Sequence, residues 1–300
     1  MGATPPLRPV TDAEIETFRT DGVVCLRGVM PADWLDHMVE PVEEAISGDA
    51  AADLSKMGDD IAAATGADRT VDPAVHDADT PRGRFVAGTD HWRLQDEFLD
   101  FAVHSPLGAL VAAVLEADDV WLYEDSVLVK EPGTEERTAF HQDMAYFHLD
   151  GDRVCTTWVP LDPVTAGSGA VRYVVGSHLD RTRYRPNLFV TTMSIPGTEG
   201  EEVPDYDDHA VVAQHGAARI ISFDTRPGDV VIHHARTIHG ANANASATLR
   251  RRAISVRYAG TGTVFSPVAG APGKTHHDGV MAGAPLDDEH FPRAWPPAAD

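Results

Sequence analysis

The segment PGDVVIHHARTIHG, residues 227–240, decides the prediction of the fold. It opens with a Pro-Gly-Asp turn, continues as a short apolar run that is typical of a buried strand, and ends in a His-Gly pair. A turn and strand in this order, ahead of His-Gly, would place an imidazole at the mouth of a barrel. His239 is therefore the candidate metal ligand of this segment, whereas we interpret its rivals His233 and His234 as structural residues.

The chain on both sides of this segment has the same character. Helices are predicted upstream: Thr11 and Glu14 form a capping box, an amphipathic helix begins at Pro31, and a further helix covers residues 98–115. Short strands are then predicted at 120–123, 126–130, 153–159, 170–175, 220–223, 229–233 and 252–258. This order predicts a mainly β fold with flanking helices, and a double-stranded β-helix (jelly-roll, cupin-like) core fits the strands.

We expect residues 1–300 to form a single domain, because no stretch resembles a linker between independent units. Its expected parts are N-terminal helical support over about 10–115, a jelly-roll core over about 118–260 and a C-terminal tail over 261–300. Residues 48–88 are predicted to be helix fragments and loops, and residues 181–216 form a long irregular stretch. Long loops of this kind commonly bind ligands, so we expect substrate contacts from residues 50–93 and 181–216.

Charge and composition exclude several classes of partner. The formal net charge of −23 would repel phosphate backbones, so nucleic acid is not an expected partner. No apolar run is long enough to span a bilayer, and no basic face for a membrane surface is evident. The N-terminus lacks the pattern of a secretory signal, and two cysteines cannot form a disulfide framework. We therefore expect a cytoplasmic protein that is a monomer or a weak homodimer.

A metal site is predicted from the pattern His-x-Asp followed by a distant histidine. Two imidazoles and one carboxylate can hold iron(II) on one face and leave the other positions open for a co-substrate and O₂. His-x-Asp occurs four times, beginning at His141, His148, His178 and His276. His141 and Asp143 follow a predicted strand and precede an aromatic pair, whereas the other copies lie in turns or in a Gly/Pro-rich segment. His141, Asp143 and His239 are therefore the candidate ligands.

The order of motifs resembles the phytanoyl-CoA dioxygenase family of Fe(II)- and 2-oxoglutarate-dependent oxygenases. The matching blocks are DGVVCLRGV (21–29), LVK (128–130), HQDMAYF (141–147), TWVPL (157–161), GSG (167–169), GSH (176–178), PGD through HG (227–240) and RRAIS (251–255). The resemblance implies a jelly-roll core, Fe(II) on His141, Asp143 and His239, and 2-oxoglutarate and O₂ as co-substrates.

The resemblance also implies residues that bind 2-oxoglutarate. Arg251 matches the arginine that binds the distal carboxylate, because strand alternation turns Arg250 and Arg252 away from the face of Arg251 and Ser255. The other expected co-substrate contacts are Trp158, Thr156, Gln142, Tyr123, Lys130 and Ser255.

The expected reaction is hydroxylation of an unactivated C–H bond in a small molecule, with 2-oxoglutarate and O₂ converted to succinate and CO₂. Halogenating relatives lack the metal-binding carboxylate, so Asp143 favours oxygen chemistry. Acyl-CoA esters are anionic, so for this acidic chain we expect a free small molecule instead. The alternatives are a non-catalytic jelly-roll binding protein, the same fold with another metal and non-oxidative chemistry, or an enzyme that acts on a CoA ester or an acyl-thioester carrier.

Overall fold

The computed structural model describes residues 4–72, 75, 81–209 and 218–297, and its centre is a large antiparallel sheet. The strand order is β1 (Val23–Leu26), β10 (Val230–His234), β7 (Val154–Pro160), β12 (Arg251–Gly260), β4 (Val120–Lys130), β3 (Phe85–Thr89) and β2 (Ala51–Asp53), and β14 (Arg293–Trp295) also pairs with β4. A second sheet contains β5 (Thr138–His141), β11 (His239–Ala241), β8 (Val171–Val174) and β9 (Ile220–Ser222), and β13 (Val264–Phe265) pairs with β6 (Leu149–Asp150). Two antiparallel sheets with helices outside them are the mainly β architecture that the sequence predicts.

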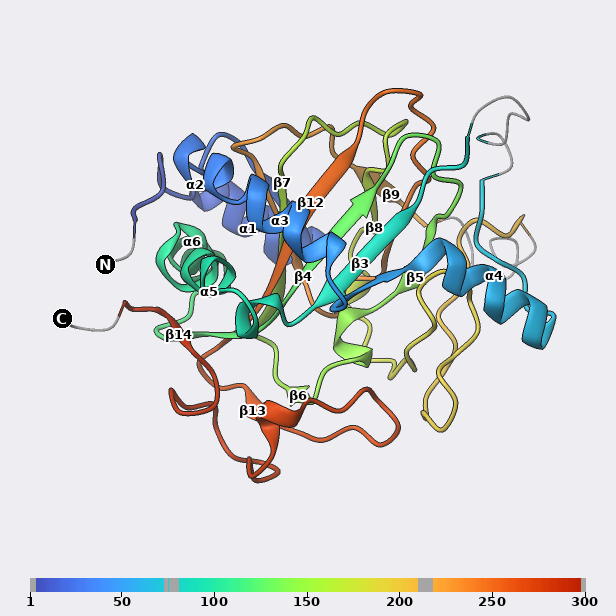
Figure 1. Ribbon diagram of the computed structural model, residues 1–300. Coiled ribbons are helices and arrows are strands. Elements are labelled where there is room, and N and C mark those ends of the chain that lie inside the picture. Colours follow the sequence, from blue (N-terminus) through green and yellow to red (C-terminus); the bar gives the residue numbers. More distant parts are fainter. Residues whose placement is uncertain (1–3, 73–74, 76–80, 210–217, 298–300) are drawn as a thin grey trace.

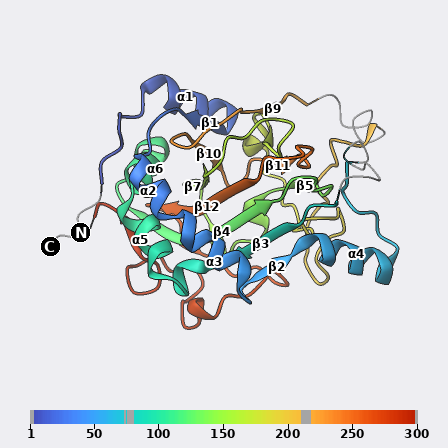
Figure 2. The ribbon, with the colours of Figure 1, turned by 45° about the horizontal axis from the view of Figure 1, so that its top comes forward.

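Helices cover the outer face of the large sheet (Figures 1 and 2). They are α1 (Asp12–Asp21), α2 (Ala32–His37), α3 (Val39–Ser47), α5 (Asp96–His104) and α6 (Leu107–Leu115), while α4 (Leu54–Thr65) lies beyond the β2 edge. Short 3₁₀ helices are η2 (His91–Arg93), η3 (Asp143–Ala145), η4 (Ser177–Leu179) and η5 (Thr275–His277). Phe101 and Leu110 pack against Val127 and Ile254 of the sheet, so the main core lies between helices and sheet and leaves the inner face for the site.

Two of the predicted helices are each divided in two by a proline. The helix predicted from Pro31 stops at His37 and restarts at Val39, because Pro41 cannot donate a backbone hydrogen bond to the carbonyl of residue 37. The prediction over 98–115 likewise becomes α5 and α6, since Pro106 ends one helix and begins the next. The capping box of α1 is confirmed, with Glu14 N donating to Thr11 Oγ1.

β4 is one strand of 11 residues, so the predicted break between residues 123 and 126 is wrong. Glu124 and Asp125, which suggest a turn in the sequence, are both buried in the strand. The pairing with β12 shifts at this point, because Arg257 faces Glu124 while Tyr258 faces Leu122. Tyr123 is therefore the extra residue of a β-bulge, a feature that re-aims side chains next to many active sites.

The C-terminal segment returns to the large sheet instead of leaving it. β14 pairs with the start of β4, and Phe265 and Phe291 join Tyr123 and Phe147 in a second core cluster. Among the described residues, no single helix is long and apolar enough to cross a membrane, although α5 and α6, bent by 43°, pass that test together by length and composition.

Candidate metal centre

Two strands and one 3₁₀ helix bring the candidate ligands together. β5 ends at His141, η3 begins two residues later at Asp143, and β11 begins at His239. In the antiparallel pair of β5 and β11, His239 lies directly opposite His141. Gly240 permits this close pairing, since a Cβ at that position would lie 2.7 Å from the carbonyl oxygen of Thr138.

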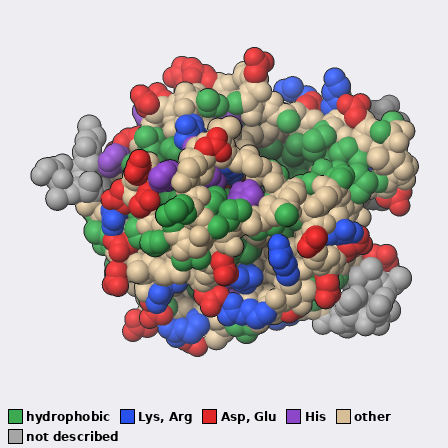
Figure 3. All heavy atoms as spheres, turned by 90° about the horizontal axis from the view of Figure 1, so that it is seen from below, with side chains coloured by type: hydrophobic (Ala, Val, Ile, Leu, Met, Phe, Trp, Pro, Cys, Tyr) green, Lys and Arg blue, Asp and Glu red, His purple; other side chains and the backbone are tan. Residues whose placement is uncertain are grey.

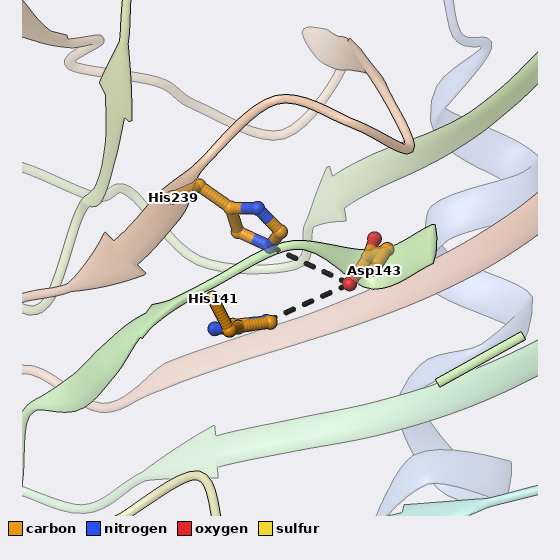
Figure 4. Close-up of side chains that lie close together, drawn as sticks. All are labelled: His141, Asp143 and His239. Carbon is orange, nitrogen blue, oxygen red and sulfur yellow. Dashed lines mark ion pairs between the residues drawn. The ribbon is translucent and has the colours of Figure 1, made fainter. Parts of the chain in front are cut away.

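The three side chains point toward one another (Figure 4). Asp143 Oδ1 lies 3.5 Å from His141 Nε2 and 3.6 Å from His239 Nε2. One ligand atom from each residue can be chosen so that all three lie within 4.8 Å of one another, and all three residues are buried. This is the arrangement that one metal ion bound by two imidazoles and one carboxylate requires.

Hydrogen bonds fix the orientation of each ligand. His141 Nδ1 donates to the carbonyl of Ala139 at 2.8 Å, and His239 Nδ1 donates to the carbonyl of Thr237 at 2.9 Å, so both Nε2 atoms are free for a metal. Asp143 Oδ2, the oxygen that faces away from both histidines, accepts the hydroxyl of Thr156 and lies 3.2 Å from His233 Nε2. The carboxylate is thus held with only Oδ1 turned to the metal position.

The electrostatics of the site favour the protonation states that bind metal. Burial alone would raise the pKa of Asp143, but His239, His141 and His233 around it lower that pKa well below the ordinary value. Burial, with His141 and His233 nearby, also lowers the pKa of His239 well below its ordinary value. An ionised carboxylate and a neutral imidazole are the forms that coordinate a metal ion.

Arg251 lies in a narrow cavity of about 40 Å³ that the three ligands also line. The residue is 2% exposed, Nη1 donates to the carbonyl of Leu128 at 3.3 Å, and Nε has no hydrogen-bond partner. No carboxylate of the described residues pairs with it. Burial lowers its pKa to about 10, so it is charged at neutral pH, and an isolated buried cation of this kind fits an incoming carboxylate.

Only some of the other residues predicted to bind the co-substrate lie in this cavity. Trp158, Thr156 and Ser255 line it, and the guanidinium carbon of Arg251 lies 5.9 Å from the centre of the Trp158 ring. Lys130 Nζ instead donates to the carbonyls of Glu136 and Asn242.

Gln142 and Tyr123 lie outside this cavity. Gln142 Nε2 donates to the carbonyl of Arg236. The Tyr123 hydroxyl accepts from the backbone N–H of His148 within the second core cluster, because the bulge leaves Tyr123 on the side of Phe147. No contact supports a co-substrate role for either residue, and both roles stay predictions.

The rival histidines and arginines lie away from the metal centre, with one exception. Among them, His276 packs edge to face against the ring of Trp92. His148 lies against the carbonyl of Pro272, His178 against that of Arg19 and His234 against that of Asp152. Arg250 pairs with Glu43 and Glu131, and Arg252 pairs with Asp162, both on the face opposite to Arg251. The exception is His233, which touches Asp143 inside the cavity.

Sequence reasoning missed Arg257, which lines the cavity of Arg251 and a second, larger cavity. Arg257 lies two positions beyond Ser255 on the same face of β12. The alternation that selects Arg251 would have indicated Arg257 as well. The larger cavity is lined in part by residues such as Leu54, Ala87 and Phe189, from the stretches 50–93 and 181–216 where substrate contacts are predicted. The sequence gives no sign of its other walls, which include β4 and the C-terminal segment.

A jelly-roll barrel that holds two imidazoles and one carboxylate beside a buried arginine defines a class of metal-dependent oxygenases. The model of the family Phytanoyl-CoA dioxygenase (PhyH) matches residues 18–253, and the chain belongs to this family, as the sequence predicts.

Curated and structural relatives agree with this assignment. A probable alpha-ketoglutarate-dependent hypophosphite dioxygenase of Stutzerimonas stutzeri is 26% identical over 145 residues, which are 47% of this chain and 46% of that protein. The chain therefore matches about half the length of this relative.

The similar solved structures include SnoK, a non-heme alpha-ketoglutarate-dependent carbocyclase from nogalamycin biosynthesis, with a TM-score of 0.66 and 23% identity over 98% of this chain and 100% of that one. The epimerase SnoN, in complex with Fe³⁺, alpha-ketoglutarate and nogalamycin RO, has a TM-score of 0.66 and 22% identity over 94% and 98% of the two chains. At these identities the likeness establishes the fold, and the predicted jelly-roll core is confirmed.

Proposed function

We propose that this chain is an Fe(II)- and 2-oxoglutarate-dependent oxygenase that hydroxylates an unactivated C–H bond of a small-molecule metabolite. One observation carries the proposal: the buried His141, Asp143 and His239 share a cavity with Arg251, a buried cation that has no carboxylate partner among the described residues. Another metal with non-oxidative chemistry would leave Arg251 without a purpose.

The roles of the chain's own residues follow from the geometry. His141, Asp143 and His239 hold the metal from one side, and Arg251 binds the distal carboxylate of 2-oxoglutarate. Iron, 2-oxoglutarate and O₂ supply the oxidation of the C–H bond, with succinate and CO₂ as the products of the co-substrate. Trp158 and Ser255 line the cavity around Arg251 and keep bulk water from the ion pair.

Hydroxylation is the outcome that we favour, because Asp143 keeps the third ligand position that a halide would need. SnoK and SnoN are described as a carbocyclase and an epimerase, so the product of the reaction has to be identified chemically. We further propose that the chain works in the cytoplasm as a single-domain monomer or weak homodimer, with both cysteines as free thiols.

The test is anaerobic addition of Fe(II) and 2-oxoglutarate to the metal-free protein, with detection of the visible charge-transfer band of the chelate. We expect a band in the wild type and no band in His141→Ala, Asp143→Ala or His239→Ala. His148→Ala, which alters another His-x-Asp copy, is the matched control and should keep the band. A folded, metal-loaded wild type without the band refutes the proposal in favour of a binding protein or another metal.

A further inference from the structure

We infer that the larger cavity is the substrate site, and that it takes an uncharged, largely apolar molecule whose single polar group lies against Glu124 and Lys274. This inference rests on the proposed function, since it identifies the class of substrate for the same metal centre.

The position of the larger cavity supports a substrate role. It encloses about 390 Å³, which lies in the range of roughly 300–1,000 Å³ for small-molecule sites. Asp143 and Arg257 line both this cavity and the narrow one, so the two spaces adjoin at the metal. A molecule bound here would present a carbon atom to the metal centre.

Most of the cavity wall is apolar and is formed by alanines of β2 and β3, Ala87 among them, and by larger side chains from other segments. These are Leu54 of α4, Leu128 of β4, Tyr146 and Phe147 after η3, Phe189, and Pro272 of the C-terminal segment. Figure 3 shows the molecule from below, where apolar side chains lie among acidic and basic ones and histidines lie near the middle of the face. Apolar walls of this kind favour a hydrocarbon skeleton.

Charged side chains meet at one end of the cavity, and they pair with one another. Lys274 Nζ lies 2.6 Å from Asp90 Oδ2 and also pairs with Glu124, and Glu124 Oε1 lies 3.6 Å from Arg257 Nε. Glu124 reaches the cavity because it shares a face of β4 with Ser126, and the regular pairing with β12 sets it opposite Arg257. Two cations thus face two carboxylates.

This balance leaves no charge for an ionic substrate. An ion that entered the cavity would lose its hydration, and it would have to compete with the ion pairs that Glu124 forms with Lys274 and Arg257, which is costly. A hydroxyl, carbonyl or amide group can still form hydrogen bonds with Glu124 or Lys274. The same reasoning disfavours a phosphate-bearing carrier, which the net charge of −23 would also repel.

The test uses metal-free protein and the uncharged dye N-phenyl-1-naphthylamine, which fluoresces in apolar sites. Three competitors share one ring system: 1-naphthylmethanol is uncharged, 1-naphthoate is an anion and 1-naphthylmethylammonium is a cation. We expect the alcohol to displace the dye at a concentration about tenfold lower than either ion does. Displacement by either ion at the same concentration as the alcohol overturns the inference.

One variant tests whether the dye binds in the larger cavity, and a second variant tests the charge balance at its end. Ala87→Phe fills the cavity and should abolish dye binding, whereas Ala63→Phe on the exposed face of α4 should not. Glu124→Gln removes the negative charge that pairs with Lys274 and Arg257. The concentration of 1-naphthoate needed to displace the dye should therefore fall by about tenfold. Unchanged dye binding in Ala87→Phe, or unchanged selectivity in Glu124→Gln, contradicts the proposed site.

The outcomes separate this inference from the proposed function. If the iron chelate band forms but the dye does not bind, the substrate inference fails and the oxygenase proposal stands. If the dye binds as expected and no band forms, the oxygenase proposal fails.

Discussion

Replacing Arg251 by methionine tests the proposed 2-oxoglutarate site most directly. Arg251 is 2% exposed, and methionine keeps an unbranched apolar stem while it removes the guanidinium, which pairs with no carboxylate in the described part of the chain. Arg251→Met should therefore weaken 2-oxoglutarate binding and leave iron binding intact, since none of the three ligands contacts Arg251 by an ion pair or hydrogen bond.

The structure gives the size of the effect. Burial lowers the pKa of Arg251 from 12.5 to about 10. That difference corresponds to a penalty of roughly 3 kcal/mol for keeping the guanidinium charged without a partner. A carboxylate that binds beside it recovers an energy of this order, within the 2–5 kcal/mol that loss of one partner from a buried charge pair typically costs. We therefore expect a Kd for 2-oxoglutarate about 100-fold higher in the variant.

The assay is an anaerobic titration of the Fe(II) protein with 2-oxoglutarate and with 2-oxopentanoate, which lacks the distal carboxylate. The wild type should prefer 2-oxoglutarate by about 100-fold, and Arg251→Met should bind the two acids about equally. Arg250→Met is the control, because Arg250 pairs with Glu43 and Glu131 on the opposite face. A wild-type preference that persists in Arg251→Met would refute the assigned role.

Three further predictions concern the metal site and its support. Thr156→Val removes the hydroxyl that orients the metal-binding carboxylate, and the Fe(II) affinity measured by chelator competition should fall at least about tenfold; an unchanged affinity contradicts this role. Gly240→Ala places a Cβ 2.7 Å from a carbonyl oxygen of β5, so both Fe(II) affinity and Tm should fall, by about 1–3 kcal/mol in stability; a normal Tm would show that β11 has room. The third prediction concerns pH. Burial lowers the pKa of His234 from 6.5 to about 4, so as the pH falls His234 is protonated in the unfolded chain before it is protonated in the folded chain. Stability from this group is complete above pH 6.5 and is lost as the pH falls toward 4, by up to roughly 3 kcal/mol. In urea denaturation His234→Asn should lose less stability than the wild type between pH 7 and 4.5, whereas the exposed His37→Asn should follow the wild type.

The sequence predicts the parts of the site that depend on local order. His-x-Asp puts two ligands on one turn, and a turn, a strand and His-Gly put the third at a strand end. Alternation along β12 selects Arg251 from three consecutive arginines, and the structure places it in the cavity while its neighbours face acids on the surface. Such periodicity is a property of the strand itself and can be read without the fold.

The parts that the sequence does not predict depend on register and on distant segments. The bulge at Tyr123 cannot be found from the apolar pattern of β4, yet it places Tyr123 beside Phe147 in the second core cluster, whereas Glu124 stays on the face of β4 that lines the larger cavity. Glu124 and Asp125 look like a turn because acidic residues are seldom buried without partners. Glu124 finds such a partner in Lys274, a residue 150 positions later in the chain.

The residues fixed by strand pairing and the residues of the cavity walls have different functions. The metal ligands and Arg251 lie on β5, β11, β12 and the turn after β5, where backbone pairing fixes them, so the reaction type follows from the sheets. The larger cavity has β3, β4 and the segment that begins at η3 as part of its wall, and it is completed by Leu54 of α4, by Phe189 and by the C-terminal residues Pro272 and Lys274, which lie outside the two sheets. Changes in those segments can alter the cavity without disturbing the ligand geometry. Substrate preference should therefore change through substitutions near Lys274 or Leu54, while the iron chelate band of the same variants stays that of the wild type.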